Sequence, residues 1–373
     1  MNLKGLFSIG IADILGTGIA SLFWFFLATL VEPEEFGEIF YFIGIATLAS
    51  YIALIGAQET LVVYVAKKIK IQSTLNLLSL LVAGISFVII IIIFNKIDTS
   101  FLLLGFVINT LAIGDLLGRK NFNGYLKYFL TQKILLLTLG LTFYHLFGVE
   151  GILYAMALSF GAYTIRVVKG FKESKINFVL LKPHMGFIAN NYLMRLADNS
   201  KNQIDKLIIA PILGFALLGN YALAIQLVGI LFIFSTIVFK YTLSEDAVGN
   251  RNTKLKKMSL LFSIGIAIMG FFLSPIIIPE LFPKYIEVID AIQIMVFTTI
   301  PFSIGTIYKS RILGLVKSKL LVISTLGSLI TMIIGMITLG TTFGIIGLAF
   351  AFVLAISVET IILFLLSIKI EQK

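Results

Sequence analysis

The sequence predicts an all-α polytopic membrane protein with about twelve transmembrane helices in two six-helix lobes. Three observations lead to this fold class. Hydrophobic residues make up 59% of the 373 residues and charged residues only 13%, against about 45–50% and about 25% in soluble domains. The apolar residues gather in runs that reach the roughly 20 residues a membrane helix needs, and the two halves of the chain share sequence features. This composition excludes a soluble enzyme, a nucleic-acid-binding module, a disordered chain and a secreted scaffold.

Twelve apolar segments are expected to cross the membrane, joined by connections too short to hold a soluble domain. The first segment is not expected to be a cleaved signal peptide, because it is too long and the acidic residues Glu32, Glu34 and Glu35 follow it. The predicted spans are 7–30, 37–65, 75–94, 101–118, 126–146, 149–168, 186–212, 219–239, 258–278, 287–308, 319–340 and 344–367.

Basic residues predict the orientation of these spans. With alternating sides, one set of loops and both termini hold 23 of the 29 Lys and Arg residues, whereas the opposite loops hold only Lys96 and Lys284. Cytoplasmic loops of membrane proteins carry the excess of Lys and Arg. We therefore expect a multi-pass protein of the cell (cytoplasmic) membrane with both termini in the cytoplasm. The net charge of +10 comes mainly from the Lys and Arg residues of these loops. It therefore indicates topology, and no nucleic-acid partner is expected.

Two pairs of matching segments indicate an internal duplication. Ala28 and Gly37 match Ala210 and Gly219 at an offset of 182 residues, and the segment FGVEGILYAMAL from Phe147 matches FGIIGLAFAFVL from position 343 at an offset of 196. Small residues are common in membrane helices, but two matches near half the chain length favour duplication. We expect an N-terminal lobe at 1–182 and a C-terminal lobe at 183–373. An even number of spans in each half predicts a pseudo-two-fold axis along the membrane normal.

The seventh span carries an unusual set of polar residues at membrane depth. At about 100° per residue, most of them share an arc of about 120°, which suits a hydrated face. There are two structural alternatives. The segment could be an interfacial helix, or its charges could form ion pairs within the helix that join Arg195 to Asp198 and Lys201 to Asp205. Charged groups in the bilayer more often mark a transport path. The candidate substrate-contacting residues are Asn191, Arg195, Asp198, Asn199, Lys201, Asn202, Asp205 and Lys206.

Other charged residues within predicted spans have less specific interpretations. Asp13 is equivalent to Arg195 by the repeat, and we expect the two to face each other between the lobes. Asp13, Glu59 and Glu359 are candidates for ion coupling or lobe contact. Lys133 either lies within the bilayer or extends its amine to the interface. Asp115 and Arg119, four residues apart, are expected to form a local pair.

Motifs for catalysis are absent from the sequence. It contains no GxxxxGK[ST] loop for ATP hydrolysis, no HExxH motif and no compact acidic cluster in a loop that would hold a metal–sugar-nucleotide. Cysteine is also absent, which excludes a disulfide frame and a thiolate metal site. We therefore expect no enzymatic activity, no metal and no cofactor beyond H⁺ or Na⁺ as a coupling ion.

Three features resemble the polysaccharide flippases (Wzx-like exporters of O-antigen and teichoic acid) of the multidrug/oligosaccharidyl-lipid/polysaccharide (MOP) exporter superfamily. These are the segment LATLVEPEEFGEIFYF, the segment QIDKLIIAPILGFALLGNYALAIQL and the twelve spans in a six-plus-six repeat. The resemblance implies a V-shaped pair of lobes around a central cavity. It also implies that a polyprenyl-diphosphate-linked saccharide moves from the cytoplasmic to the outer leaflet by alternating access.

Arg195, Lys201 and Lys206 would supply cations for a diphosphate, and the amides and carboxylates of the same helix would suit sugar hydroxyls. The expected partners are the lipid bilayer, the lipid-linked saccharide and glycan polymerase or glycosyltransferase machinery, with the protein acting as a monomer. Three other functions remain open: a cation-coupled multidrug exporter of the same superfamily, an integral-membrane lipid-linked glycosyltransferase, and an assembly scaffold that transports nothing.

Overall fold

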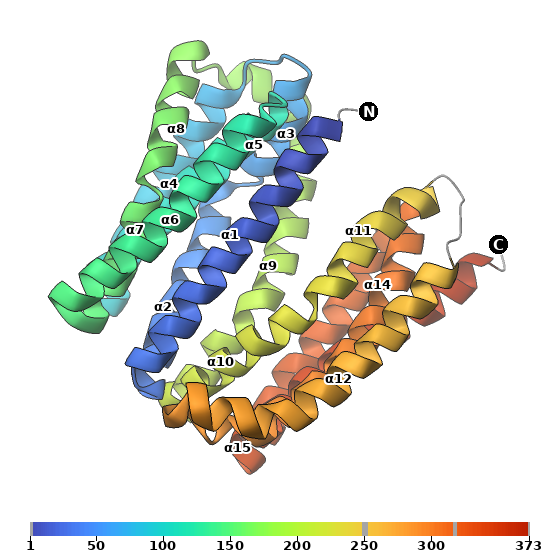
Figure 1. Ribbon diagram of the computed structural model, residues 1–373. Helices are drawn as coiled ribbons and strands as arrows, with labels where there is room; N and C mark the ends of the chain where they lie inside the picture. The colour runs from blue at the N-terminus through green and yellow to red at the C-terminus, as the bar shows by residue number, and fades with distance from the viewer. Residues whose placement is uncertain (1–2, 248–252, 316–318, 372–373) are drawn as a thin grey trace. The chain divides into compact units, whose positions relative to one another are not determined.

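The chain is a multi-pass helical membrane protein. The computed structural model describes residues 3–247, 253–315 and 319–371, and the regular secondary structure of these ranges is entirely helical (Figure 1). Within them, seven helical segments are long and apolar enough to cross a membrane, or eight if a bent pair counts as one span. Two of the seven, 122–173 and 320–370, have 52 and 51 residues. Each is therefore long enough for two crossings, and each folds back at a glycine described below. The prediction of about twelve helices is confirmed.

Contacts divide the chain into two compact units. Unit 1 comprises Met1–Leu27 and Phe42–Gln203, and unit 2 comprises Ala28–Tyr41 and Ile204–Lys373. The expected lobe boundary after residue 182 stays a prediction, as does the placement of one lobe relative to the other.

Unit 1 is built around α5, which packs against α3, α4, α7 and α8. An apolar residue fills most positions of α5, but Gly105, Gly114 and Gly118 let neighbouring helices approach closely. The helices that lie wholly or partly in this unit are α1 (Leu3–Leu30), α2 (Pro33–Leu54), α3 (Ala57–Ala66), α4 (Gln72–Phe94), α5 (Ile97–Gly118), α6 (Phe122–Phe147), α7 (Gly151–Ser159), α8 (Gly161–Glu173) and α9 (Met185–Leu213), with the 3₁₀ turns η1 (Gly148–Glu150) and η2 (Phe178–His184).

Unit 2 repeats this arrangement, with α13 and α14 together in the place of α5. They pack against α10, α11, α12 and α15. The helices are α10 (Phe215–Leu231), α11 (Ile233–Ala247), α12 (Thr253–Leu281), α13 (Val288–Met295), α14 (Thr299–Gly314) and α15 (Lys319–Glu371), with η3 (Pro283–Tyr285) and η4 (Val296–Thr298). α10 and α11 form the bent pair, with an angle of 47° between them.

The two repeated FG segments make the same turn in both units. Gly148 follows α6 with φ of 66°, and Gly344 interrupts α15 with φ of 57°. Left-handed backbone of this kind favours glycine. Three residues later, a Cβ atom on Gly151 or Gly347 would clash with the carbonyl oxygen eight residues earlier, at Phe143 or Leu339. Both turns therefore fold a long helix into an antiparallel pair by the same local geometry, which supports the duplication.

The other repeated glycines, Gly37 and Gly219, lie against each other within unit 2. A Cβ on Gly37 would clash with the carbonyl oxygen of Phe215, and a Cβ on Gly219 would clash with that of Pro33. Since 33 and 215 differ by the same 182 residues, the contact is reciprocal. The first turns of α2 and α10 meet backbone to backbone around a local two-fold axis, which only glycine permits.

We predict that Gly219→Ala destabilises the folded protein by about 1–3 kcal/mol, because the added methyl group meets a carbonyl oxygen that belongs to a helix backbone. The midpoint of thermal unfolding of detergent-solubilised protein measures this loss. Gly265→Ala in α12 is the matched control, since its Cβ would meet nothing within 4 Å. An unchanged midpoint for Gly219→Ala would contradict the close contact.

Candidate functional site

The second predicted span is interrupted between α2 and α3. Ile55 and Gly56 both have positive φ, of 48° and 70°. A β-branched residue in this region is a genuine outlier, and such strain persists only where the surrounding structure imposes it. Interrupted membrane helices often line the binding sites of transporters. The sequence pattern did not predict this break.

The seventh predicted span, α9, packs directly on the break. A Cβ on Gly56 would lie 2.7 Å from the carbonyl oxygen of Ile188 and 3.0 Å from the backbone nitrogen of Tyr192. One turn further along each helix, the guanidinium of Arg195 forms an ion pair with the carboxylate of Glu59. The side chains of Arg195 and Glu59 are 46% and 25% exposed, and the second oxygen of Glu59 is buried without a hydrogen-bond partner. The pair thus leaves one acceptor unused.

Arg195 and Asp205 lie at different positions along the axis of α9. Arg195 lies 18 residues before the end at Leu213, which corresponds to about 27 Å along the axis, and Asp205 lies 8 residues before it, at about 12 Å. The two residues are therefore about 15 Å apart along the helix axis.

Unit 1 encloses a polar cavity next to this break, which we name the α6 cavity. Its volume is about 270 Å³, just below the range for small-molecule sites. Its wall combines aromatic rings with hydroxyl and amide groups. It is lined by Trp24, Thr47, Ser50, Tyr51, Phe106, Asn109, Thr110, Phe129, Gln132, Lys133, Leu136, Met156 and Phe160.

Lys133 is the charged group among the described residues of this lining. Its amine lies 5.2 Å from the ring centroid of Phe129, a cation–π distance, and the neighbouring Gln132 donates to Ser159 at 3.0 Å. Lys133 is 11 residues from the start of α6 and 14 from its end, so it lies near the middle of this helix. Both interpretations of this lysine stay predictions.

Tyr51 connects the two features. It lines the α6 cavity and also the small space beside Glu59 and Arg195. Because α2 ends one turn after Tyr51, the helix break fixes where this ring lies. Aromatic surface, a cation and an ion pair with a free acceptor therefore occupy adjoining space within unit 1.

Asp205 and Lys206 belong to unit 2, so the polar residues of α9 do not form one site within a single unit. Asp205 is buried. One of its oxygens accepts from the Lys206 backbone at 2.8 Å and lies 3.3 Å from the Lys206 amine. The fully buried Tyr221 is near enough to interact electrostatically with Asp205, and its hydroxyl has no hydrogen-bond partner.

The remaining predicted residues have varied outcomes. The Asn191 amide is buried with an unpartnered nitrogen, whereas Asn199 donates to the Arg195 carbonyl at 2.8 Å within its own helix. Glu359 is half-buried in α15 and interacts with neighbouring groups. The expected facing of Asp13 and Arg195 stays a prediction, because Arg195 pairs with Glu59 in unit 1 and the Asp13 side chain is not described. Four predicted side chains lie outside the described residues: Asp13, Asp198, Lys201 and Asn202.

Sequence reasoning missed most of the α6 cavity. Asn109 with Thr110 and Gln132 with Lys133 are adjacent polar pairs inside apolar spans, and this signal would have identified two of its walls. Among the described residues, no three His, Asp or Glu side chains come together as a metal site.

The fold is that of MOP-superfamily transporters. A MATE-family multidrug resistance transporter of this superfamily, in an inward-facing conformation, is similar with a TM-score of 0.70 at 16% identity, over 97% of both chains. The lipid II flippase MurJ gives a TM-score of 0.80 at 15% identity, over 96% of this chain and 87% of the other.

A MOP transporter from Pyrococcus furiosus, described by a reversed polarity of its binding pocket, gives a TM-score of 0.62 at 17% identity, over 98% and 94% of the two chains. No family model and no curated protein matches the sequence.

We predict that the Arg195–Glu59 pair contributes a coupling free energy of about 1 kcal/mol, since both side chains are partly exposed. A double-mutant cycle of Glu59→Gln and Arg195→Gln, followed by unfolding in detergent, measures it. The control cycle uses Glu32 and Lys284, a pair at 3.0 Å with 61% and 34% exposure, for which we expect less than about 0.5 kcal/mol. Additive effects at Glu59 and Arg195 would argue against the pair.

Proposed function

We propose that this chain is a transporter that moves a polyprenyl-diphosphate-linked saccharide from the cytoplasmic to the outer leaflet by alternating access. The lysine-rich ends of the helices and both termini then face the cytoplasm, and the protein resides in the cell membrane. The similarity of the fold to the lipid II flippase MurJ supports the proposal. The transporters it resembles also support the absence of enzymatic activity.

The observation that carries the proposal is the cation in the α6 cavity. An amine in the middle of a membrane helix is costly and therefore usually marks a functional site, and no carboxylate neutralises Lys133 among the described residues of the lining. A diphosphate would supply that counter-charge through charge-assisted hydrogen bonds. The amide and hydroxyl groups of the same wall suit saccharide hydroxyls, while the lipid tail stays in the bilayer.

The second cation on the proposed path is Arg195. Its pairing with Glu59 is incomplete, because Arg195 is 46% exposed and one Glu59 oxygen has no partner. An incoming phosphate would compete with Glu59 for the guanidinium. A carboxylate released in this way would titrate more readily, and proton or Na⁺ exchange at Glu59 would couple transport to an ion gradient.

A multidrug exporter is the alternative, and the aromatic rings of the α6 cavity favour it. Trp24, Phe106, Phe129 and Phe160 offer surface on which flat aromatic drugs would stack. Lys133 would repel a cationic drug, so this alternative fits neutral or anionic compounds. A glycosyltransferase or a scaffold has no structural observation in its favour.

We predict that Lys133→Met lowers the rate of lipid-linked saccharide translocation in proteoliposomes at least about tenfold, because one hydrogen bond to a charged group is lost. Lys133→Arg should retain most of the rate. Lys127→Met is the matched control, since Lys127 is an exposed lysine on the same helix. Export of a neutral or anionic drug without saccharide translocation would favour the alternative, and sugar transfer by purified protein would refute both.

A second prediction concerns water along α9. Because the chain contains no cysteine, single cysteines can be introduced directly. We expect Asn191→Cys and Asn199→Cys to react with a membrane-impermeant maleimide in at least one transport state. Leu193→Cys is the control, because Leu193 is 63% exposed on the side predicted to face lipid and should stay unreactive. Unreactive positions 191 and 199 in every condition would contradict a hydrated path.

A further inference from the structure

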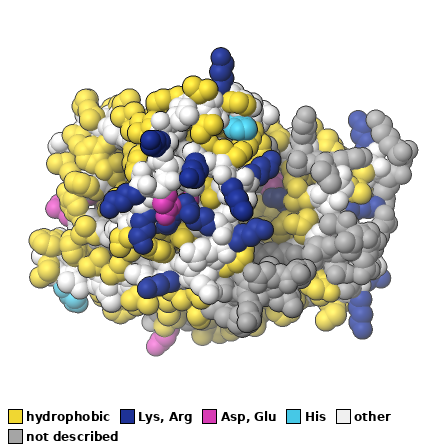
Figure 2. Space-filling model, turned by 90° about the horizontal axis from the view of Figure 1, so that it is seen from above, with side chains coloured by type: hydrophobic (Ala, Val, Ile, Leu, Met, Phe, Trp, Pro, Cys, Tyr) yellow, Lys and Arg dark blue, Asp and Glu magenta, His cyan; other side chains and the backbone are white. Residues whose placement is uncertain are grey.

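A second cavity lies at the lysine-rich end of unit 1, away from the α6 cavity. Its volume is about 650 Å³, and it is lined by Val65, Ala66, Lys68, Lys70, Gln72, Gly118, Arg119, Lys120 and Glu173. We name it the end cavity. Figure 2 looks onto this end, where dark blue Lys and Arg side chains gather on unit 1 around a magenta carboxylate. The volume lies within the range of small-molecule sites.

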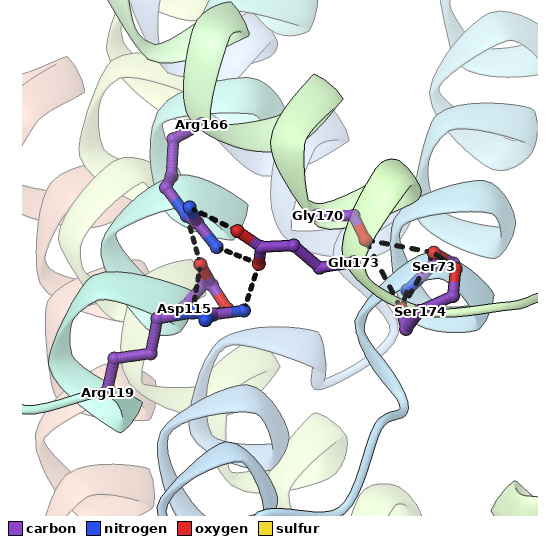
Figure 3. Close-up of polar contacts among 7 residues, drawn as sticks. All are labelled: Ser73, Asp115, Arg119, Arg166, Gly170, Glu173 and Ser174. Carbon is purple, nitrogen blue, oxygen red and sulfur yellow. Dashed lines mark hydrogen bonds and ion pairs between the residues drawn. The ribbon is translucent and has the colours of Figure 1, made fainter.

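Glu173, the acidic residue of the lining, already forms ion pairs with arginines. Glu173 pairs with Arg166 at 2.6 Å and also with Arg119, while Asp115 pairs with Arg119 at 2.9 Å and also with Arg166 (Figure 3). This network of two guanidiniums and two carboxylates has no net charge. It is larger than the local Asp115–Arg119 pair expected from the sequence, because α8 contributes half of it.

Three lysines of the end cavity therefore remain as excess positive charge. Lys68, Lys70 and Lys120 are exposed, and none of them forms an ion pair within the described residues. They reach the cavity from two helix ends, α3 and α5. An anion bound here would interact with all three.

Two of these lysines occupy positions where glycine is usual. Lys68 and Lys120 have φ of 62° and 57°, and each follows a helix that ends in the same way. The Lys68 and Ile69 backbone nitrogens donate to Val65 and Tyr64, and those of Lys120 and Asn121 donate to Leu117 and Leu116. Glycine normally holds this left-handed position. Lysine at both positions indicates a role for its charge.

Gln72 adds an acceptor to the lining. Its side chain is only 5% exposed, and its amide oxygen is buried with no hydrogen-bond partner. A buried acceptor without a donor is costly. A hydroxyl group of a ligand would satisfy it, whereas the phosphate of a diester, which carries no proton to donate, would not.

We propose that the end cavity binds a phosphate ester that carries free hydroxyl groups. The phosphate lies among Lys68, Lys70 and Lys120, and a hydroxyl donates to Gln72. Two sources share this chemistry: the headgroup of a lipid such as phosphatidylglycerol, and a soluble polyol phosphate. Basic pockets between membrane helices bind anionic headgroups in this way. The site is separate from the proposed transport path and stands independently of it.

The test is a titration of the purified full-length protein with phosphatidylglycerol, followed by native mass spectrometry. In the variant Lys68→Gly/Lys120→Gly, both lysines are lost but both left-handed positions receive the residue that favours them, so the thermal midpoint should not fall. We expect the Kd to rise roughly thirty-fold. The control variant Lys172→Ala/Lys175→Ala removes two exposed lysines of the same end, and its Kd should stay within about twofold.

Two further measurements identify the ligand. Gln72→Met should weaken phosphatidylglycerol binding but leave phosphatidylethanol, a diester with no headgroup hydroxyl, unaffected; equal weakening of both would refute the hydroxyl contact. Displacement by glycerol 3-phosphate would indicate a soluble ligand, and no displacement would indicate a lipid. Wild-type affinity in the Lys68→Gly/Lys120→Gly variant, or an equal loss in the control, would overturn the proposal.

Discussion

Close backbone contact at glycine positions the short helix α3, and both sites of unit 1 depend on where α3 lies. On one side, Cβ atoms on Gly114 and Gly118 of α5 would lie 2.9 Å from the Gln58 carbonyl oxygen and 2.7 Å from that of Leu61. On the other side, Gly56 admits the backbone of α9. Any larger side chain would push these helices apart. The first contact brings the end of α3 beside the end of α5, where the lysines gather, and the second brings Glu59 within reach of Arg195.

The charges of unit 1 differ in how fully they are paired. At the lysine-rich end of unit 1, charges are numerous and paired: Asp115 and Glu173 each form ion pairs with two guanidiniums. Away from this network, Arg195 pairs with Glu59, and Lys133 lies against an aromatic ring, with no carboxylate partner among the described residues of its cavity. Because desolvation makes an unpaired charge costly, an anion bound beside Lys133 would gain more from its cation than one bound beside the paired arginines.

The sequence was sufficient for features that depend on local patterns. Hydropathy predicted the spans, and the repeat correctly paired Gly148 with Gly344, whose backbones make the same turn. It was insufficient where a feature depends on residues far apart in the chain. The α6 cavity draws on residues from Trp24 to Phe160, and no local pattern shows which polar groups of different helices meet. The partner of Arg195 could not be predicted for the same reason, since Glu59 reaches it only because α2 breaks at Ile55 and Gly56.

The division between the two units falls inside helices rather than in loops. It passes between Leu27 and Ala28 in α1, between Tyr41 and Phe42 in α2, and between Gln203 and Ile204 in α9. No flexible linker therefore joins the units at these three crossings. Intact helices bend only gently unless proline, a bulge or a similar defect is present. A change of conformation at these crossings would therefore bend helices rather than reorder a loop, and Pro211 of α9 is the position at which such a bend would concentrate.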